Sequence, residues 1–433
     1  ASCVATNPDG SVTVSFSFKP GRSMLESERN LQSAANEALC SATGVCMEHF
    51  DTDGTPLVLG GRSFTSKGQL PKKYQTPYGE VSVKRHVYQG PKGGTTFCPM
   101  EQDARVFRTA TPLFARQCAM KYASTHSSDA VKDFAEHGRH ITRSYVREVG
   151  SDVALVADQK EEAWTFAPPQ IPPGKRVKTV SVGVDGACML MAKGGGWRQT
   201  MAGTLALYDD EGERLHTTSV GAAPESGKAT FFARMDGELA RIKSMYPEAR
   251  YVGIADGAAD HWPWLETNTN WQVLDFWHAC EYINDVSTVM ATGQGFARAW
   301  AETTCHQLKH GSGTAACLLG AMTDRLEGGV RGKAARESLQ KAITYFTNNL
   351  HRMDYPFCRA MGFSIGSGVT EAACKCVVKA RMCGTGMRWD SKGAAEVLRL
   401  RAMIKTEGRW EQYWDKVSRH GFARITAPKR ARK

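Results

Sequence analysis

No stretch of the sequence reaches the roughly 18 consecutive apolar residues that a membrane-spanning helix needs. The opening residues, ASCVATNPDG, have neither the basic start nor the apolar stretch of a secretory signal. None of the 13 cysteines forms a C-x-x-C pair, which is the most frequent opening of a zinc site. We therefore expect a cytoplasmic protein with reduced, free thiols and without bound zinc.

The composition combines enough apolar residues for a sizeable core with an excess of basic residues. Hydrophobic residues make up 42% of the 433 positions, and a chain of this length predicts two or three domains. Lysine and arginine number 55 against 44 aspartates and glutamates, which gives a formal net charge of +11. Two interpretations stay open. The protein is either basic with no special partner, or its excess cations contact DNA phosphates, where counterion release drives binding.

Residues 1–75 are predicted to form a mixed helical and irregular region. Residues 1–22 look like a lead-in without regular structure. Ser23 and Glu26 have the S-x-x-E spacing of a capping box, which predicts a helix over SMLESERNLQSAANEALC. Residues 51–76 are rich in glycine, threonine and proline, so we expect irregular structure there. The metal-binding side chains of this region are poorly spaced for zinc: Cys40, Cys46 and His49.

The segment 76–166 is predicted to contain a strand and then a DNA-binding helical region. In YGEVSVKRHVY, valines alternate with polar residues, which is typical of a half-buried strand. Helical patterns follow, with Ser127 or Ser128 as the cap of the middle helix. Two short helices around a glycine-containing turn fit a helix-turn-helix whose second helix presents Arg143 and Arg147 to DNA. An ordinary helical hairpin explains the same pattern, and the sequence leaves both interpretations open.

A proline-rich segment, APPQIPPGK at residues 167–175, marks the clearest boundary. Four closely spaced prolines cannot continue a helix or pair within a central strand. The patterns beyond it predict three strands, a helix, a strand, a helical turn and another strand, which is the order of a mixed sheet with helices on its faces. The predicted segments are the first part of an α/β core (176–277), a helical insertion (278–360), the last core helices (361–420) and a basic tail (421–433).

Three acids far apart in the sequence are candidates for a metal site. Asp185 lies in GVDG and Asp256 in GIADGA, and we interpret each as the end of a buried strand. Carboxylates at neighbouring strand ends repel one another unless a cation lies between them. Glu371 lies in the first turn of a helix that begins at Ser367, after the glycines of IGSG. Hard carboxylate oxygens select Mg²⁺ or Mn²⁺ over zinc.

Each acid also has a purely structural interpretation. Asp-Gly is a common turn pair, and Glu371 fits a partner of the helix dipole or one half of an ion pair with Lys375. The order of two strand-end aspartates followed by a helical glutamate favours the metal site. Two ions about 4 Å apart can activate water or a 3′-hydroxyl on one side of a phosphate and stabilise the leaving oxygen on the other.

Four blocks, GVDGACM, ADGAADHW, LDFWHACEYI and IGSGVTEAACK, resemble those of the ISKra family of bacterial insertion-sequence transposases. The later RMCGTGMRWDSKGAAEVLRLRA resembles the closing segment of that family, and the likeness extends from about residue 76 to residue 415. The resemblance implies an α/β ribonuclease-H-like mixed sheet with helices on both faces, an α-helical insertion and a mainly helical N-terminal DNA-binding region. It also implies that Asp185, Asp256 and Glu371 are the acids of a DDE enzyme. Similar proteins tend to carry a cysteine knuckle after the Y-G-x-V-x-V strand, and here Cys98 alone is kept.

By this resemblance, we expect a DNA transposase that uses two Mg²⁺ or Mn²⁺ ions to cleave and transfer DNA strands. Its expected partners are double-stranded DNA at the terminal inverted repeats and target DNA near the bacterial nucleoid, bound by a homodimer or larger assembly. A nuclease or resolvase without strand transfer and a domesticated, non-catalytic DNA-binding protein stay open as alternatives. Asp275 and His278 are expected to support the site. The side chains expected to contact DNA are Arg143, Arg147, Lys375, Lys379, Arg381, Arg388 and Trp389.

Overall fold

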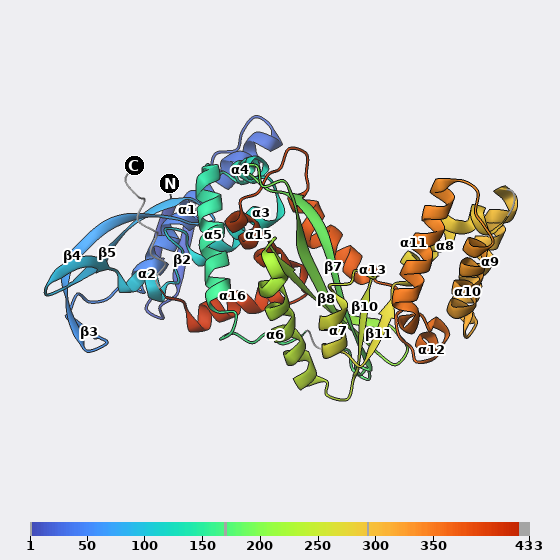
Figure 1. Cartoon of the computed structure of the whole chain (residues 1–433). Coiled ribbons are helices and arrows are strands. Elements are labelled where there is room, and N and C mark those ends of the chain that lie inside the picture. Colours follow the sequence, from blue (N-terminus) through green and yellow to red (C-terminus); the bar gives the residue numbers. More distant parts are fainter. Residues whose placement is uncertain (1, 169–170, 292–293, 424–433) are drawn as a thin grey trace. The chain divides into compact units, whose positions relative to one another are not determined.

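The computed structural model describes the whole chain except residues 1, 169–170, 292–293 and 424–433 (Figure 1). The chain divides into two compact units. We call them the N-terminal unit (Ala1–Phe166 with Arg409–Lys433) and the sheet unit (Ala167–Gly408). The first division falls at the start of the proline-rich segment. None of the described helices is long and apolar enough to cross a membrane.

The N-terminal unit contains two antiparallel sheets. Its strands are β1 (Ser2–Thr6), β2 (Val12–Phe16), β3 (Leu57–Leu59), β4 (Arg62–Gln75), β5 (Glu80–Gly90) and β6 (Gly93–Phe97). β1 pairs with β2, and the other four form a sheet in the order β3-β4-β5-β6. The strand predicted from YGEVSVKRHVY is confirmed as β5. The predictions of a lead-in without structure at 1–22 and of irregular structure at 51–76 are wrong. Most residues of β2 and β4 are exposed, so these strands carry little of the buried alternation that reveals a strand in a sequence.

The long helix α1 (Met24–Glu48) follows the first hairpin. The Ser23 hydroxyl accepts a hydrogen bond from the Glu26 amide, as the capping-box spacing predicts. The Glu26 carboxylate accepts from the amide of Arg22, one residue earlier than in a standard capping box. α1 runs beyond the predicted segment. Its apolar stripe is hard to recognise because it is built mostly of small residues: Ala38, Cys40, Ala42, Gly44 and Met47.

The helices of the N-terminal unit are α2 (Pro99–Asp103), α3 (Pro112–Ser124), α4 (Ser127–Glu136), α5 (Arg143–Gln159) and α16 (Arg409–His420). The turn between α4 and α5 contains Gly138 at φ +71°, a conformation that favours glycine. Neither Ser127 nor Ser128 caps α4, contrary to the prediction. The chain enters this helix one residue earlier, and His126 takes the cap position without a side-chain hydrogen bond. The Thr142 hydroxyl caps α5.

Helix α16 packs within the N-terminal unit, so the segment predicted as core, 361–420, extends too far. Trp410, Tyr413 and Trp414 of α16 are buried. The Tyr413 hydroxyl donates a hydrogen bond to the carbonyl of Val153, and its ring lies 5.7 Å from that of Trp164. The sequence shows that α16 is amphipathic but not which partner its apolar face covers. Of the predicted basic tail, only residues 421–423 are described.

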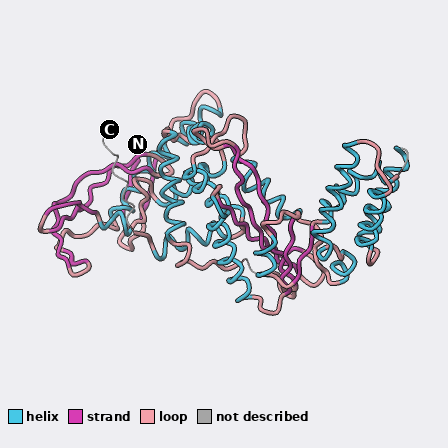
Figure 2. Tube along the Cα trace, in the orientation of Figure 1, coloured by secondary structure: helices cyan, strands magenta, loops and turns pink. Residues whose placement is uncertain are grey.

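The sheet unit is an α/β structure around a mixed five-stranded sheet, whose strands are magenta in Figure 2. The strand order is β11-β10-β7-β8-β9. β7 and β10 are parallel, as are β10 and β11, whereas β8 is antiparallel to both β7 and β9. The predicted order of three strands, a helix, a strand, a helical turn and a strand is confirmed. The strands are β7 (Thr179–Leu190), β8 (Trp197–Tyr208), β9 (Arg214–Ala222), β10 (Arg250–Ala255) and β11 (Trp271–Leu274).

Helices pack on both faces of this sheet. A Cβ atom at Gly203 would stand 2.4 Å from the sulfur of Met235 in α6. A Cβ atom at Gly183 would stand 1.9 Å from the Thr370 hydroxyl in α13. Gly183 lies opposite Thr204 in the ladder, so positions 183 and 203 face opposite sides of the sheet. The helices here are α6 (Ala229–Met245), α7 (Trp262–Asn268), α13 (Gly368–Ala373), a π-helical turn (Cys374–Lys379), α14 (Ala380–Met382) and α15 (Ser391–Lys405).

The predicted helical insertion is confirmed within the described part of 278–360, where no strand occurs. It comprises α8 (Phe276–Met290), α9 (Gln294–His310), α10 (Thr314–Glu327), α11 (Lys333–Asn349) and α12 (Tyr355–Ala360). Its buried residues join those of the sheet in one hydrophobic core, among them Ile283, Leu318 and Phe346. The insertion and the sheet are therefore parts of the same folded body.

Candidate active site

Asp185 lies inside β7 and not at its end, which corrects the sequence-based prediction. β8 pairs with β7 as far as Leu190, so the strand continues beyond this acid. β10, on the other edge of β7, pairs with it only as far as Gly183. Asp185 is thus the second residue past the point where the parallel part of the sheet ends. One Asp185 oxygen accepts a hydrogen bond from the Gly186 amide, 2.6 Å away.

Asp256 follows directly after β10, as predicted. Its Oδ1 accepts a hydrogen bond of 3.0 Å from the amide of Ala258. Gly257 between them adopts φ +97°, a conformation that would strain any other residue. His261 is almost fully buried and places Nδ1 3.8 Å from an Asp256 oxygen. Burial lowers the pKa of His261, which favours a neutral ring beside this loop.

Glu371 lies in the first turn of α13, the helix that begins after Ser367. The Ser367 hydroxyl donates to a Glu371 carboxylate oxygen at 3.2 Å. The hydroxyls of Thr370 and Thr204 are 2.7 Å apart, which ties α13 to β8. Gly183 leaves the space in which Thr370 sits, so the absence of a side chain on β7 lets this helix approach the sheet.

The three predicted acids line one cleft of about 630 Å³ (Asp185, Asp256 and Glu371). They come from a strand, a loop after a second strand and a helix, and they converge at the edge where β10 ends. Lys375, Lys379 and His278 line the same cleft. The cleft therefore combines carboxylate oxygens with fixed or titratable positive charge.

A tighter group of metal-binding atoms lies on one side of this cleft. One ligand atom each of Asp275, His278 and Glu371 can be chosen so that all lie within 4.8 Å of one another. Asp185, Asp256 and Glu371 do not form such a tight group among the described residues. Mutual repulsion of three carboxylates opposes closer approach unless a cation balances them.

Asp275 is a structural acid, because it is fully buried and both of its oxygens accept hydrogen bonds. Oδ1 caps α8 by accepting from the amides of Trp277 and His278 at 2.6 and 3.0 Å. Oδ2 accepts from the amide of Ser367, which precedes α13. Burial alone would raise the pKa of Asp275, but the contacts with His278 and Ser367 outweigh it and hold this pKa well below the usual range. Asp275 thus fixes the starts of two helices that border the cleft.

The pKa of His278 is raised, which favours its protonated form at neutral pH. Its Nδ1 lies 3.4 Å from Asp275 Oδ1, and this carboxylate raises the pKa of His278 to about 9 against the opposing effect of burial. A protonated imidazole donates hydrogen bonds and does not bind a metal ion. His278 is therefore better suited to a phosphate oxygen than to a metal, and the tight group is better explained as a helix cap with an ion pair.

The residues predicted to contact DNA fall into different surroundings. Lys375, Lys379 and Arg388 are exposed, and the first two lie at the cleft. Arg381 is only 7% exposed and its guanidinium lies over the Trp389 ring, 4.8 Å from the centroid, so it offers DNA far less surface than Lys375 or Lys379, and its contact with DNA stays a prediction. The π-helical turn before it changes the helical phase that a regular α-helix would give.

Three further residues were predicted to contact DNA, and they lie in two different parts of the chain. Trp389 is half-buried and donates its indole N–H to the Met382 carbonyl. Arg143 and Arg147 are exposed one turn apart on α5, in the N-terminal unit. α5 buries residues along most of its length, which is compatible with a helix-turn-helix and with a plain hairpin alike.

The cysteines named in the sequence do not gather at the cleft. Cys40 and Cys98 are buried, and burial raises the pKa of both thiols, which disfavours the thiolate form that binds metal. Cys46 is exposed on α1.

Sequence reasoning missed several residues at the cleft. Trp277 is 62% exposed and Glu281 lies one turn later on α8, and both line the cleft. Cys374 also lines it, where burial and the neighbouring Asp185 raise the pKa of its thiol. An exposed Trp directly after a helix cap is the one available sequence clue, since Cys374 falls in an ordinary apolar pattern. Comparisons of the chain with protein-family models and with curated proteins give no match.

Proposed function

We propose that the protein is a metal-dependent enzyme that cleaves DNA strands and joins them to new ends, on a ribonuclease-H-like core. The observation that carries this proposal is the convergence of Asp185, Asp256 and Glu371 on one cleft from three separate elements. The mixed sheet with helices on both faces supports the ribonuclease-H-like interpretation, as does the helical insertion before Glu371. The motif blocks that resemble ISKra transposases supply these same three acids.

The donor atoms fit Mg²⁺ or Mn²⁺. All three acids offer hard carboxylate oxygens in a cleft open to water. Their separation exceeds what one ion requires, whereas two ions about 4 Å apart need ligands spread over a wider space. Asp185, Asp256 and Glu371 would hold the ions. Such ions, when bound, activate water or a 3′-hydroxyl for attack on a phosphate and stabilise the leaving oxygen.

The protein's own cations have a separate task in this proposal. The raised pKa of His278 favours its protonated form at neutral pH, and Lys375 and Lys379 are exposed on the same cleft. Their charge attracts a phosphodiester and stabilises the negative charge that develops on its oxygens. In the N-terminal unit, Arg143 and Arg147 would hold flanking duplex DNA through its phosphates. Joining two element ends requires two active sites, which is why we propose a homodimer or larger assembly on DNA.

The test is incubation of the full chain with supercoiled plasmid and a short duplex that carries a free 3′-hydroxyl, with Mg²⁺, with Mn²⁺ or with EDTA. We expect nicked and linear plasmid with either metal, together with plasmid joined to the labelled duplex. Cleavage without joined products would favour a nuclease or resolvase. DNA binding without any cleavage, over a range of metal concentrations, would favour the non-catalytic DNA-binding protein and contradict the proposal.

A further inference from the structure

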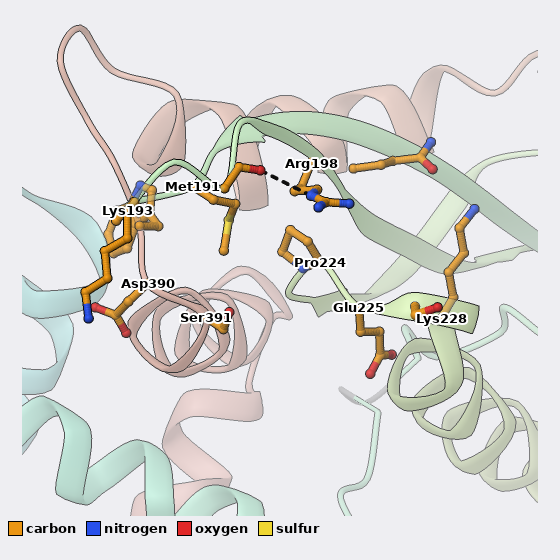
Figure 3. A pocket seen from close by; sticks show the side chains of 13 residues that line it. Met191, Lys193, Arg198, Pro224, Glu225, Lys228, Asp390 and Ser391 are labelled. Carbon is orange, nitrogen blue, oxygen red and sulfur yellow. Dashed lines mark hydrogen bonds between the residues drawn. The ribbon is translucent and has the colours of Figure 1, made fainter.

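A second hollow of about 620 Å³ lies in the sheet unit, at the β7–β8 hairpin and the starts of α6 and α15. Figure 3 shows Lys193, Arg198 and Lys228 around it, contributed by the hairpin turn, by β8 and by the turn before α6. Trp389 also lines it. Three cations from separate segments around one hollow indicate a site for an anion.

The two acids of the hollow, Glu225 and Asp390, both accept hydrogen bonds from backbone amides. Glu225 accepts hydrogen bonds from the amides of Thr230 and Phe231, at the start of α6. Asp390 accepts from the amide of Gly393 and caps α15. Both carboxylates keep their negative charge while they cap helices, and among the described residues neither forms an ion pair with Lys193 or Arg198.

The cations differ in their present partners. Lys228 pairs with Asp260. Arg198 donates through Nε to the carbonyl of Gly195, and among the described residues its remaining N–H groups have no acceptor. Within the described part of the chain, no carboxylate forms an ion pair with Lys193 or Arg198, and both side chains are exposed. These two cations are the free positive charge of the hollow.

The hollow shares a wall with the acid cleft. Gln199 lines the hollow, and Gly186 lines the cleft. The Gln199 amide nitrogen lies 2.1 Å from the point where a Cβ atom at Gly186 would stand, so the two residues are in direct contact. The two places are therefore neighbours at β7, where the Gly186–Gln199 contact lies on the α6 face of the strand and the Asp185 side chain on the α13 face.

We propose that this hollow, formed around Lys193 and Arg198, binds the sugar–phosphate backbone of an unpaired DNA strand that leaves the acid cleft. This inference rests on the proposed function and names where the strand beside the reacting phosphate is held. A volume of about 620 Å³ admits a nucleotide or two of an extended single strand, but not a duplex. Cations beside an aromatic side chain are typical of sites that track single strands. Here Arg381 covers one face of the Trp389 ring, so the cations carry the proposed contact with the backbone.

The experiment measures binding of the full chain to two labelled oligonucleotides in Ca²⁺, one a blunt duplex and the other the same duplex with a single-stranded overhang. The test variant is Lys193→Gln with Arg198→Gln. The matched control is Lys341→Gln with Arg331→Gln, which removes the same charge from exposed sites of the helical insertion. Lys193→Arg with Arg198→Lys keeps the charge and serves as the rescue variant. Thermal unfolding verifies that all variants are folded.

We expect the test variant to bind the overhang duplex roughly fivefold or more weakly and to bind the blunt duplex nearly as well as the wild type. The salt slope for the overhang substrate should fall by about 1.4, because each contact to a single-strand phosphate contributes about 0.7. The rescue variant should restore both quantities. Equal losses for the two substrates, or equal losses in the control variant, would overturn the inference.

Failure of this inference can be distinguished from failure of the proposed function. If the wild type cleaves DNA in Mg²⁺ and the test variant binds the overhang duplex as well as the wild type, the inference about the hollow is contradicted and the proposed enzymatic function is supported. If the test variant selectively loses overhang binding but the wild type does not cleave DNA, the inference about the hollow is supported and the proposed enzymatic function is contradicted. Absence of DNA binding by the wild type would contradict both.

Discussion

The hydroxyl of Tyr345 donates a hydrogen bond to the backbone carbonyl of Asp256, with 3.0 Å between the two oxygens. Tyr345 belongs to α11, and its ring stacks on Tyr282 of α8 with 4.0 Å between centroids. The same ring fills the space beside Gly257, where a Cβ atom would stand 2.8 Å from it. The helical insertion therefore holds the loop that carries one of the candidate metal-binding acids.

Replacing Tyr345 with phenylalanine should impair the reaction more than the fold. The variant keeps the aromatic stack and loses one hydrogen bond, so the free energy of unfolding should fall by about 1 kcal/mol. We expect metal-dependent DNA cleavage to fall roughly tenfold, since small displacements of a catalytic group have large effects on rate. Single-turnover cleavage and urea unfolding measure the two effects. Tyr282→Phe is the matched control, and equal cleavage rates in both variants would show that the insertion does not position Asp256.

Removal of any one acid should abolish cleavage and leave DNA binding intact. Asp185→Asn, Asp256→Asn and Glu371→Gln keep the shape of each side chain and remove a charged ligand oxygen. We expect no product above background in Mg²⁺ or Mn²⁺, and weaker binding of Mn²⁺ by calorimetry. Glu337→Gln, an exposed position on α11, should behave as the wild type does. A variant that cleaves DNA at the wild-type rate would show that its acid is not part of the active site.

The sequence predicts the sheet unit well because its strands are buried. β7, β10 and the second half of β8 are mostly apolar and buried, and residues of this kind identify a covered sheet. The strands before Ser23 and between 51 and 76 escaped prediction because their side chains are mostly exposed, and backbone pairing alone defines them. Buried strands are thus predicted from the sequence more easily than exposed strands.

For the candidate site too, the sequence predicts some features and not others. The residue types and order of Asp185, Asp256 and Glu371 are visible in the sequence, but the position of Asp185 within β7 is not. That position depends on where a different strand, β10, stops pairing. Arg381 is buried after a π-helical turn, and no spacing rule anticipates such a turn. The hydrogen bond from Tyr345 depends on tertiary packing of a distant helix, which a local pattern does not contain.

Asp275→Asn should lower stability at neutral pH and lessen its loss in acid. The buried carboxylate accepts three amide hydrogen bonds, and an amide side chain would place a donor against one of these donors. We expect a cost of about 1–3 kcal/mol near pH 7. Asp354→Asn is the control, because that acid caps α12 at an exposed position where asparagine caps well.

The pH dependence of the Asp275→Asn variant has a defined sign. The pKa of Asp275 is lowered by folding, so its stabilising effect is complete above the pKa of an unfolded aspartate, about 4, and is lost as the pH falls further. His278, whose pKa Asp275 raises to about 9, adds to the difference in unfolding free energy between wild type and variant as the pH falls, until its contribution is complete below the unfolded histidine pKa, about 6.5. The difference should therefore be nearly constant from about pH 6 to about pH 5 and shrink below about pH 4. Urea unfolding at a series of pH values measures this difference. A gap that stays constant down to the acid transition would contradict the assigned pKa direction.

Arg147→Ala separates the two interpretations of α4 and α5. If α5 contacts duplex DNA, removal of this exposed cation should weaken binding to all sequences and reduce the salt slope by about 0.9, the share of one phosphate contact. Fluorescence anisotropy at several salt concentrations measures the slope, and Lys341→Ala, an exposed cation on α11, provides the control for a general loss of charge. An unchanged slope in Arg147→Ala would favour the plain helical hairpin. A cation that makes no phosphate contact releases no counterions when DNA binds, so its removal leaves the salt slope as it was.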